Sequence, residues 1–423
     1  MSIVKHLPGA AIPEGGVPGW PVKDARRWLD ARLPAPFAPV PTGWILLPLV
    51  LAGLILSLWN APGTPARGTE WSGYPETVLL LALPAWYRFL PAATLVSALL
   101  IALHAAVALH GLGPDDTPGR VGGWLLLALC TWAFAGSLLR LRARRLQREI
   151  FLAAAGESRA ALPHALPDGH RSRGLRLIAF GGAAVLGAGA LLVWALVRDL
   201  GAGAEQPYDA TGQQVLALLL LVPGTALLGR GLGARRAARR LRAGPQPVLR
   251  VGVRSRPGGR RWLVADADTT TAPPLIAFRH RFEDGYRSGP AETLLGGPES
   301  RLRAEHHDID PYAEPYEALM YGVPHEGAEV ILRYAVHRAG STIAAELHAA
   351  PLLPYRRHGL LSWRPEGASY TLRMRAEAEK RKQRAAERSS GSGSSCGSSG
   401  GCGSSGCGSS CGSSCGGGCG GGD

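Results

Sequence analysis

The sequence predicts an α-helical membrane bundle of six transmembrane helices, followed by a small antiparallel β-rich cytoplasmic domain and a disordered tail. Three observations predict this class. Long apolar runs are confined to the first 232 of 423 residues, short alternating runs follow them, and the last 35 residues are almost all glycine, serine and cysteine. The net charge of +14 comes largely from arginines beside the apolar runs, which indicates membrane topology. No nucleic-acid partner is therefore expected.

Residues 1–43 are predicted to be a cytoplasmic N-terminal segment with one short amphipathic helix. Within residues 22–33 the apolar side chains recur at helical spacing, on a single stripe that contains Val22, Ala25, Trp28, Leu29 and Leu33. Such a stripe suits a helix that lies among lipid headgroups. A solvated linker with a chance stripe is the alternative that the pattern leaves open.

Residues 44–242 are predicted to be the transmembrane domain. Its apolar segments are 44–59, 75–89, 91–112, 121–139, 175–197 and 212–232. A helix needs roughly 20 residues to cross the apolar core of a bilayer, so the segment 75–89, which also contains Pro84, is short. Its length alone leaves open whether it crosses fully.

The distribution of basic residues decides the predicted sidedness. With six crossings and a cytoplasmic N-terminus, 21 Lys and Arg up to Arg242 lie inside and only three lie outside. The densest inside stretch is an Arg-rich loop at 140–174. If 75–89 did not cross, either the basic N-terminus or this stretch would lie outside. We therefore expect a multi-pass protein of the cell membrane, in contact with the lipid bilayer, with both termini cytoplasmic.

Residues 243–371 are predicted to be a soluble β-rich domain. Short alternating runs such as "PVLRVGVRSR" and "AEVILRYAVH" recur there between turn signals such as "RPGG" and "HEG". This pattern is typical of a small antiparallel barrel or sandwich. The following residues 372–388 combine helix-forming residues with alternating charge and are predicted to be a solvated charged helix.

The tail, residues 389–423, contains 15 Gly, 13 Ser, six Cys and one Asp, so it has nothing to bury and is predicted to be disordered. Its cysteines face a reducing compartment and are expected to be thiols at rest. Three interpretations remain: a plain tether, a substrate for a modifying enzyme, or an exchangeable site for Zn²⁺ or Cu⁺. The metal ligands would be the four cysteines with three-residue gaps, Cys407, Cys411, Cys415 and Cys419.

This Gly/Cys-rich end, with its repeated "CGSSCGSSC", resembles the C-termini of some uncharacterised multi-pass membrane proteins of high-GC bacteria. The resemblance covers the tail only. It implies a membrane location and carries no activity.

A second group of metal-ligand types lies in "EHHDIDPYAE". Imidazole and carboxylate groups suit a divalent ion, although a polar surface loop explains the same residues without one. The candidate ligands are His306, His307, Asp308 and Asp310.

The apolar segments contain few groups that indicate chemistry. His104 and His110 lie in the third segment and are interpreted as polar packing contacts or interfacial groups. Small residues recur every four positions in the fifth segment and predict a close helix contact there, through Ala179, Ala183 and Gly187.

No phosphate loop, nucleophile elbow or zinc-protease motif is present, so no catalytic or cofactor-binding residues are predicted. The predicted function is a noncatalytic membrane module that presents a β domain and a thiol-rich tail for interaction, sensing or metal handling. A protein partner or modifying enzyme would act at the domain or the tail. The alternative is a small-solute transporter gated by the cytoplasmic domain. Polarity inside the bundle discriminates between the two.

Overall fold

The computed structural model describes residues 2–58, 69, 71–111, 116–162, 170–202, 208–256, 260–268, 273–279, 308–309, 314–337, 343–354 and 379–384. The chain divides into two units, residues 1–373 and residues 374–423. In the second unit, residues 379–384 are helical and exposed, within the range predicted to be a charged helix. All other features below belong to the first unit.

The helices of the first unit follow the predicted apolar segments. Their bounds are α1 Val22–Asp30, α2 Pro39–Leu58, α3 Tyr74–Phe89, α4 Pro91–Gly111, α5 Thr117–Ala155, α6 Leu175–Gly201 and α7 Thr211–Arg242. Among the described residues, five helices (α2, α4, α5, α6 and α7) are long and apolar enough to cross a membrane. This confirms the prediction of a bundle of long apolar helices. Helix α3 has 16 residues, so it is shorter than these five.

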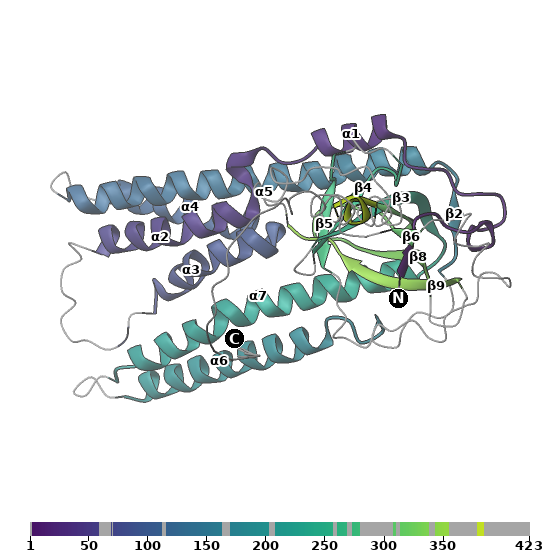
Figure 1. Ribbon diagram of the computed structural model, residues 1–423. Coiled ribbons are helices and arrows are strands. Elements are labelled where there is room, and N and C mark those ends of the chain that lie inside the picture. The colour runs from purple at the N-terminus through teal and green to yellow at the C-terminus, as the bar shows by residue number, and fades with distance from the viewer. Residues whose placement is uncertain are drawn as a thin grey trace, which may run out of the picture. The chain divides into compact units, whose positions relative to one another are not determined.

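The helices α2 to α7 alternate in direction relative to a β-sheet that lies at one end of them (Figure 1). Helix α5 reaches the sheet at its C-terminal end, where Phe151 and Ala155 join the sheet's core. Helix α7 does the same through Leu241. Helix α3 ends at Phe89 and α4 begins at Pro91, and this connection also lies on the sheet side. There Arg140 of α5 binds both the end of α3 and Glu326 of the sheet domain, as described below.

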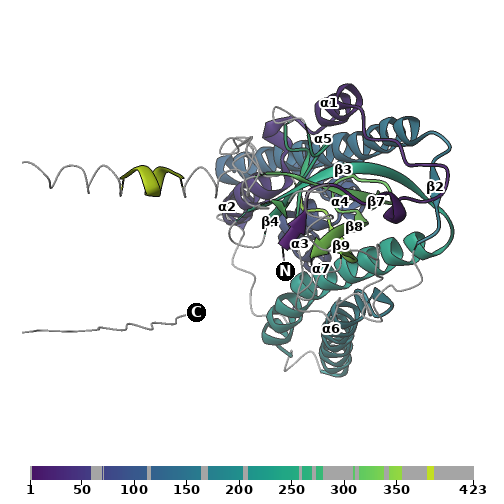
Figure 2. The same cartoon turned by 45° about the vertical axis from the view of Figure 1, so that its right-hand side comes forward.

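Helices α2 to α5 share one apolar core. It is built from buried side chains that include Leu46 of α2, Leu83 of α3, Ile101 of α4 and Cys130 of α5. Helix α6 lies apart from this core and packs mainly on α7 (Figure 2). The large apolar side chains of α6 are mostly exposed, among them Phe180, Leu186 and Leu200. In a bilayer, such side chains would contact lipid.

The pair of α6 and α7 packs through small residues at every seventh position. The buried ones are Gly181, Ala188 and Ala195 of α6, and Ala217, Gly224, Gly231 and Ala238 of α7. A Cβ atom at Gly181 would lie 2.7 Å from the carbonyl oxygen of Gly224, so only glycine permits this approach.

The contact stripe predicted for this helix was wrong. Ala179, Ala183 and Gly187 are exposed in the structure. A seven-residue repeat keeps small residues aligned along an antiparallel pair, whereas a four-residue repeat drifts around the helix.

Helix α3 connects the two groups of helices. Its Trp86 donates an indole hydrogen bond to Thr225 Oγ1 of α7 at 3.1 Å, and its Tyr74 hydroxyl donates to the Gln214 carbonyl at 2.9 Å. The guanidinium of Arg230 lies 4.4 Å from the centre of the Phe89 ring. The short helix therefore has partners on α7 along its whole length.

All strand pairings in the sheet are antiparallel, which confirms the predicted antiparallel β-rich domain. Its strands are β1 Ser2–Val4, β2 Arg159–Ala160, β3 Gln246–Arg256, β4 Arg260–Val264, β5 Ile276–Arg279, β6 Asp308–Ile309, β7 Tyr316–Tyr321, β8 Glu329–His337 and β9 Ile343–Pro351. The order is β5-β4-β3-β7-β8-β1-β6, with β2 paired to β3 and β9 paired to β8. The pairing of β8 with β9 is the longest, from Glu329–Pro351 to His337–Ile343.

Each face of the sheet is covered by a different part of the chain. One face packs against α1 and the end of α5, through Trp20, Trp28 and Phe151. The other face packs against the N-terminal segment and α7, through Leu7, Val17 and Leu241. The sheet therefore shares both of its cores with residues far outside the predicted range 243–371.

The structure corrects two expectations for the basic segments. The apolar stripe of residues 22–33 faces protein and neither lipid nor solvent, because Trp28 is 0% exposed and packs edge-on against Trp20. The Arg-rich stretch that was predicted to be a loop at 140–174 is helical up to Ala155. A 39-residue helix is about 58 Å long, so α5 extends well past a bilayer core of about 30 Å and supports the sheet.

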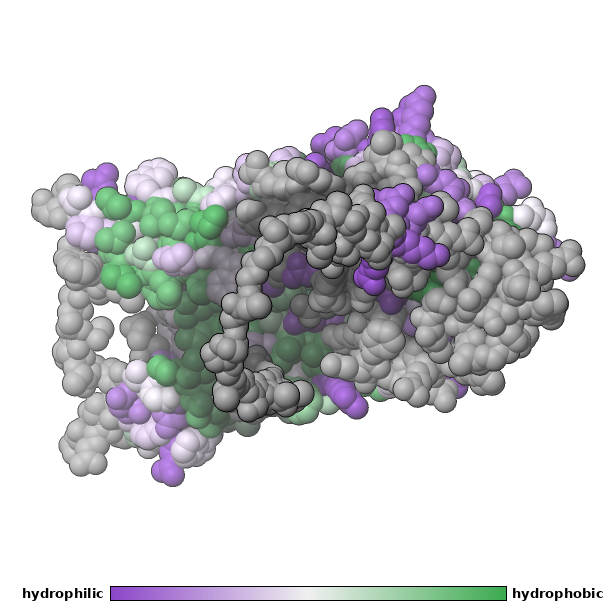
Figure 3. Space-filling model, in the orientation of Figure 1, coloured by the Kyte–Doolittle hydropathy of each residue, from purple (hydrophilic) through white to green (hydrophobic). Residues whose placement is uncertain are grey.

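The surface separates into two zones (Figure 3). Hydrophobic side chains gather over the helices away from the sheet, whereas hydrophilic ones lie over α1 and the sheet. Exposed apolar residues of this first zone include Trp44, Val107, Trp124 and Val193. Exposed apolar surface on this scale is compatible with a membrane protein.

Candidate functional site at the turn between β7 and β8

One short segment of the sheet contacts helices α1, α5 and α7. This joining turn, residues 322–328, connects β7 to β8 and begins and ends in left-handed backbone, with φ of 99° at Gly322 and 77° at Gly327. Glycine adopts this conformation without steric cost. The Gly322 N–H donates to the Pro247 carbonyl and the Ala328 N–H donates to the His325 carbonyl, so the turn is fixed from both ends.

Arg140 of α5 holds the centre of the joining turn. Its Nε and Nη2 donate to the two carboxylate oxygens of Glu326, each at 2.8 Å. Both side chains are 3% exposed. This is the two-pronged geometry that makes guanidinium and carboxylate pairs strong and directional.

The same guanidinium also binds the end of α3. Its Nη1 donates to the Tyr87 carbonyl at 2.5 Å and its Nη2 to the Arg88 carbonyl at 3.0 Å. These carbonyls belong to the last turn of α3, whose oxygens have no partner within the helix. Arg140 therefore joins three elements, α3, α5 and the joining turn, through one buried group.

Other helices contact the turn on either side of Glu326. The indole of Trp28 on α1 donates to the Pro324 carbonyl at 3.1 Å, and Gln147 of α5 donates to the Trp28 carbonyl at 3.4 Å. A Cβ atom at Gly322 would lie 2.6 Å from a methyl of Leu241, so α7 also packs closely on the turn. A displacement of any of these helices would therefore strain the turn.

Two histidines border this junction and are neutral at physiological pH. Burial, followed by the positive charge of Arg144, lowers the pKa of His325 to about 4. Burial, followed by the charges of Arg242 and Arg173, lowers the pKa of His170 to about 4. His170 lies 3.7 Å from the carboxylate of Glu329, the first residue of β8.

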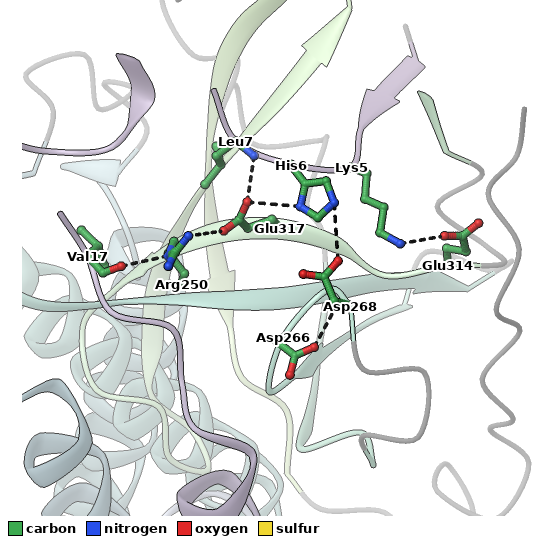
Figure 4. A network of polar contacts seen from close by, with 9 residues as sticks. All are labelled: Lys5, His6, Leu7, Val17, Arg250, Asp266, Asp268, Glu314 and Glu317. Atoms are coloured by element: carbon green, nitrogen blue, oxygen red, sulfur yellow. Dashed lines mark hydrogen bonds and ion pairs between the residues drawn. The ribbon is translucent and has the colours of Figure 1, made fainter. Parts of the chain in front are cut away.

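A second polar network ties the N-terminal segment to the middle of the sheet (Figure 4). The Glu317 carboxylate on β7 accepts from the Leu7 backbone N–H at 2.9 Å and lies 3.4 Å from Arg250 Nη1 of β3. His6 lies between Glu317, at 3.7 Å, and Asp268, at 3.4 Å. These carboxylates, Glu317 first, raise the pKa of His6. The network holds the strand β1 in place.

The predicted metal ligands are mostly outside the described residues. This holds for His306, His307, Asp310 and the tail cysteines Cys407, Cys411, Cys415 and Cys419. Asp308 is described as part of β6, where it pairs with Val4. Within the described ranges no group of three or more His, Cys, Asp or Glu is placed to hold a metal ion.

Within the helices, the structure pairs a residue that was interpreted as a packing contact. His104 Nδ1 of α4 lies 2.5 Å from a carboxylate oxygen of Glu76 on α3. His110 lies in the last turn of α4. Sequence reasoning overlooked the residues of the junction, Arg140 and Glu326. The available signals were an arginine directly after an uncharged apolar run and an acidic residue inside a turn flanked by apolar strands.

No protein-family model matches the chain, and neither a curated protein nor a solved structure shows a significant match to it.

Proposed function

We propose that this chain is a multi-pass protein of the cell membrane that crosses the bilayer six times, with the sheet and both termini on the cytoplasmic side. The alternating helix directions support this arrangement, because α3 ends on the sheet side beside Arg140. The 21 to 3 distribution of basic residues supports the same sidedness. Helix α3, at about 24 Å, would need its flanking residues to complete its crossing.

Within this arrangement, we propose a noncatalytic module that presents the sheet and the thiol-rich tail for interaction, sensing or metal handling. The observation that carries the proposal is the buried contact of Glu326 with Arg140, which also binds the end of α3. A binding event on the sheet that moves the joining turn would act directly on α3 and α5. Interfaces with two discrete packings transmit small shifts in this way.

Hydrogen exchange tests the coupling. The full chain in lipid nanodiscs would be compared with the variant Glu326→Gln, and with Glu14→Gln as a control at an exposed carboxylate. We expect faster amide exchange both in residues 322–328 and in the last turn of α3, because Gln cannot accept two bonds from Arg140. Faster exchange confined to the joining turn would contradict the coupling.

The small-solute transporter remains the second candidate, favoured by the pair of His104 and Glu76 between α3 and α4. Ionisable residues inside transmembrane helices are costly, and they mark proton or solute pathways. Proteoliposomes under a potassium diffusion potential would test it. A proton flux that is lost in Glu76→Gln would support transport, and the absence of any flux in the unmodified protein would count against it.

A further inference from the structure

A row of polar side chains crosses the sheet on the face that packs against α1 and α5. These residues lie two positions along their strands from apolar core residues of the same face, such as Val253, Leu263 and Leu332. The row occupies five adjacent strands and consists of Arg261 on β4, Ser255 on β3, Tyr316 on β7, Tyr334 on β8, and Glu346 and His348 on β9.

Contacts within the polar row are short and centre on two buried tyrosines. Arg261 Nη1 donates to Tyr316 Oη at 3.1 Å and to Tyr334 Oη at 3.2 Å. Tyr334 Oη lies 2.7 Å from His348 Nε2, and the same nitrogen lies 3.1 Å from Glu346 Oε2. Tyr316 and Tyr334 are 0% and 3% exposed, whereas Arg261 and Glu346 are half-buried. The row is therefore most accessible at its charged members.

The row contains a neutral imidazole and a protonated tyrosine. Burial lowers the pKa of His348 and raises that of Tyr334, so the imidazole is neutral and the hydroxyl keeps its proton. The 2.7 Å contact with His348 requires a hydrogen between Tyr334 Oη and Nε2, which either the phenol or a protonated Nε2 can supply. In both arrangements the Tyr334 hydroxyl accepts from Arg261 Nη1.

We propose that the polar row is a binding site for a small, singly charged carboxylate. Nε and Nη2 of Arg261 make no hydrogen bond to any residue that the structure describes, and together they match the two oxygens of a carboxylate. The inference goes beyond the proposed function, because a ligand can bind here whether or not the helices respond.

Glu346 sets the ligand class. Its carboxylate is 13% exposed and lies next to the place where the ligand's charge would sit. A dianion such as phosphate would be repelled more strongly than a monoanion. The site therefore favours a carboxylate over a phosphate group.

Ligand-observed NMR on the full chain in nanodiscs tests this site. The probe is acetate, and its binding is detected by saturation transfer from the protein to its methyl group. Inorganic phosphate is the competing class of ligand, and its binding is detected by broadening of its ³¹P line. We expect a transfer signal from the unmodified protein that is at least fivefold weaker in Arg261→Gln. Arg260→Gln is the matched control, because its side chain lies on the opposite face of the same strand.

Tyr334→Phe provides a second variant of nearly unchanged shape. The hydroxyl that it removes accepts from Arg261 Nη1, so the guanidinium loses one of the two groups that orient it, and we expect an acetate affinity weaker by about tenfold. Equal acetate signals in Arg261→Gln and Arg260→Gln would overturn the proposal. Phosphate broadening that depends on Arg261, without an acetate signal, would overturn the assignment to carboxylates. Thermal melting of each variant shows whether it is folded.

Discussion

The substitution Arg140→Met should destabilise the junction strongly. It leaves the Glu326 carboxylate, 3% exposed, without the two hydrogen bonds that it now accepts. It also removes both donors to the last carbonyls of α3. Removal of one partner from a buried ion pair costs about 3–5 kcal/mol. Arg144 Nη2, at 3.9 Å from Glu326, offsets part of this, so we expect about 3 kcal/mol.

Thermal unfolding followed by tryptophan fluorescence measures this loss, because the buried Trp28 indole reports on the joining turn. At roughly 2–4 °C per kcal/mol, the melting temperature should fall by about 10 °C. Arg142→Met, at an exposed position on the same helix, is the control and should change it little. The double variant Arg140→Met with Glu326→Leu should recover much of the loss, because Glu326 no longer leaves a buried carboxylate without its two hydrogen bonds. Equal melting temperatures for Arg140→Met and Arg142→Met would refute the reasoning.

Three further predictions concern other parts of the chain. Gly181→Val should separate α6 from α7, because its side chain would collide with the Gly224 carbonyl. Gly187→Val should be tolerated, because a Cβ atom there has no neighbour within 4 Å. Disulfide cross-linking between cysteines introduced on the two helices distinguishes the variants. Because the pKa of His325 is about 4 when folded and near 6.5 when unfolded, the unfolded chain takes up the proton first. The free energy of unfolding should therefore be highest above about pH 6.5 and fall toward pH 4, and His325→Gln should flatten this dependence in urea titrations at several pH values. Zn²⁺ binding to the full chain should release protons and should be lost when the tail cysteines are replaced by serine. Calorimetry in two buffers of different ionisation enthalpy measures both effects. If the unmodified chain and the serine variant gave the same heat in each buffer, the tail would be excluded as the site.

The helices could be predicted closely because their apolar runs are continuous. The predicted segment 75–89 is Tyr74–Phe89 in the structure, and 91–112 is Pro91–Gly111. Runs of this kind carry their own signal, since the length and hydropathy needed to cross a bilayer are local properties of the sequence. The antiparallel strands of the sheet were likewise indicated by alternation.

The partners of these elements could not be predicted in the same way. The stripe that contains Trp28 is identical whether the helix packs on lipid or on a sheet, and only the structure shows the Pro324 carbonyl that its indole binds. The strand Ser2–Val4 is too short for alternation to reveal it. Arg140 and Glu326 are separated by 186 positions, and no local pattern links residues so far apart. The proposed carboxylate site likewise draws its groups from five strands, so no single segment of the sequence signals it.

The topology of α3 is the most direct test of the proposed arrangement. Single cysteines would be introduced at Ser72, before α3, and at Gly212, near the start of α7, in a chain whose native cysteines are replaced by serine. Glu157 and Gly244, on the sheet side, would serve as the comparison, and all four positions are exposed. A membrane-impermeant thiol reagent added to intact cells should label Ser72→Cys and Gly212→Cys, and should label Glu157→Cys and Gly244→Cys only after permeabilisation. Labelling of Ser72→Cys only after permeabilisation would contradict a crossing by α3, and with it the six-pass arrangement.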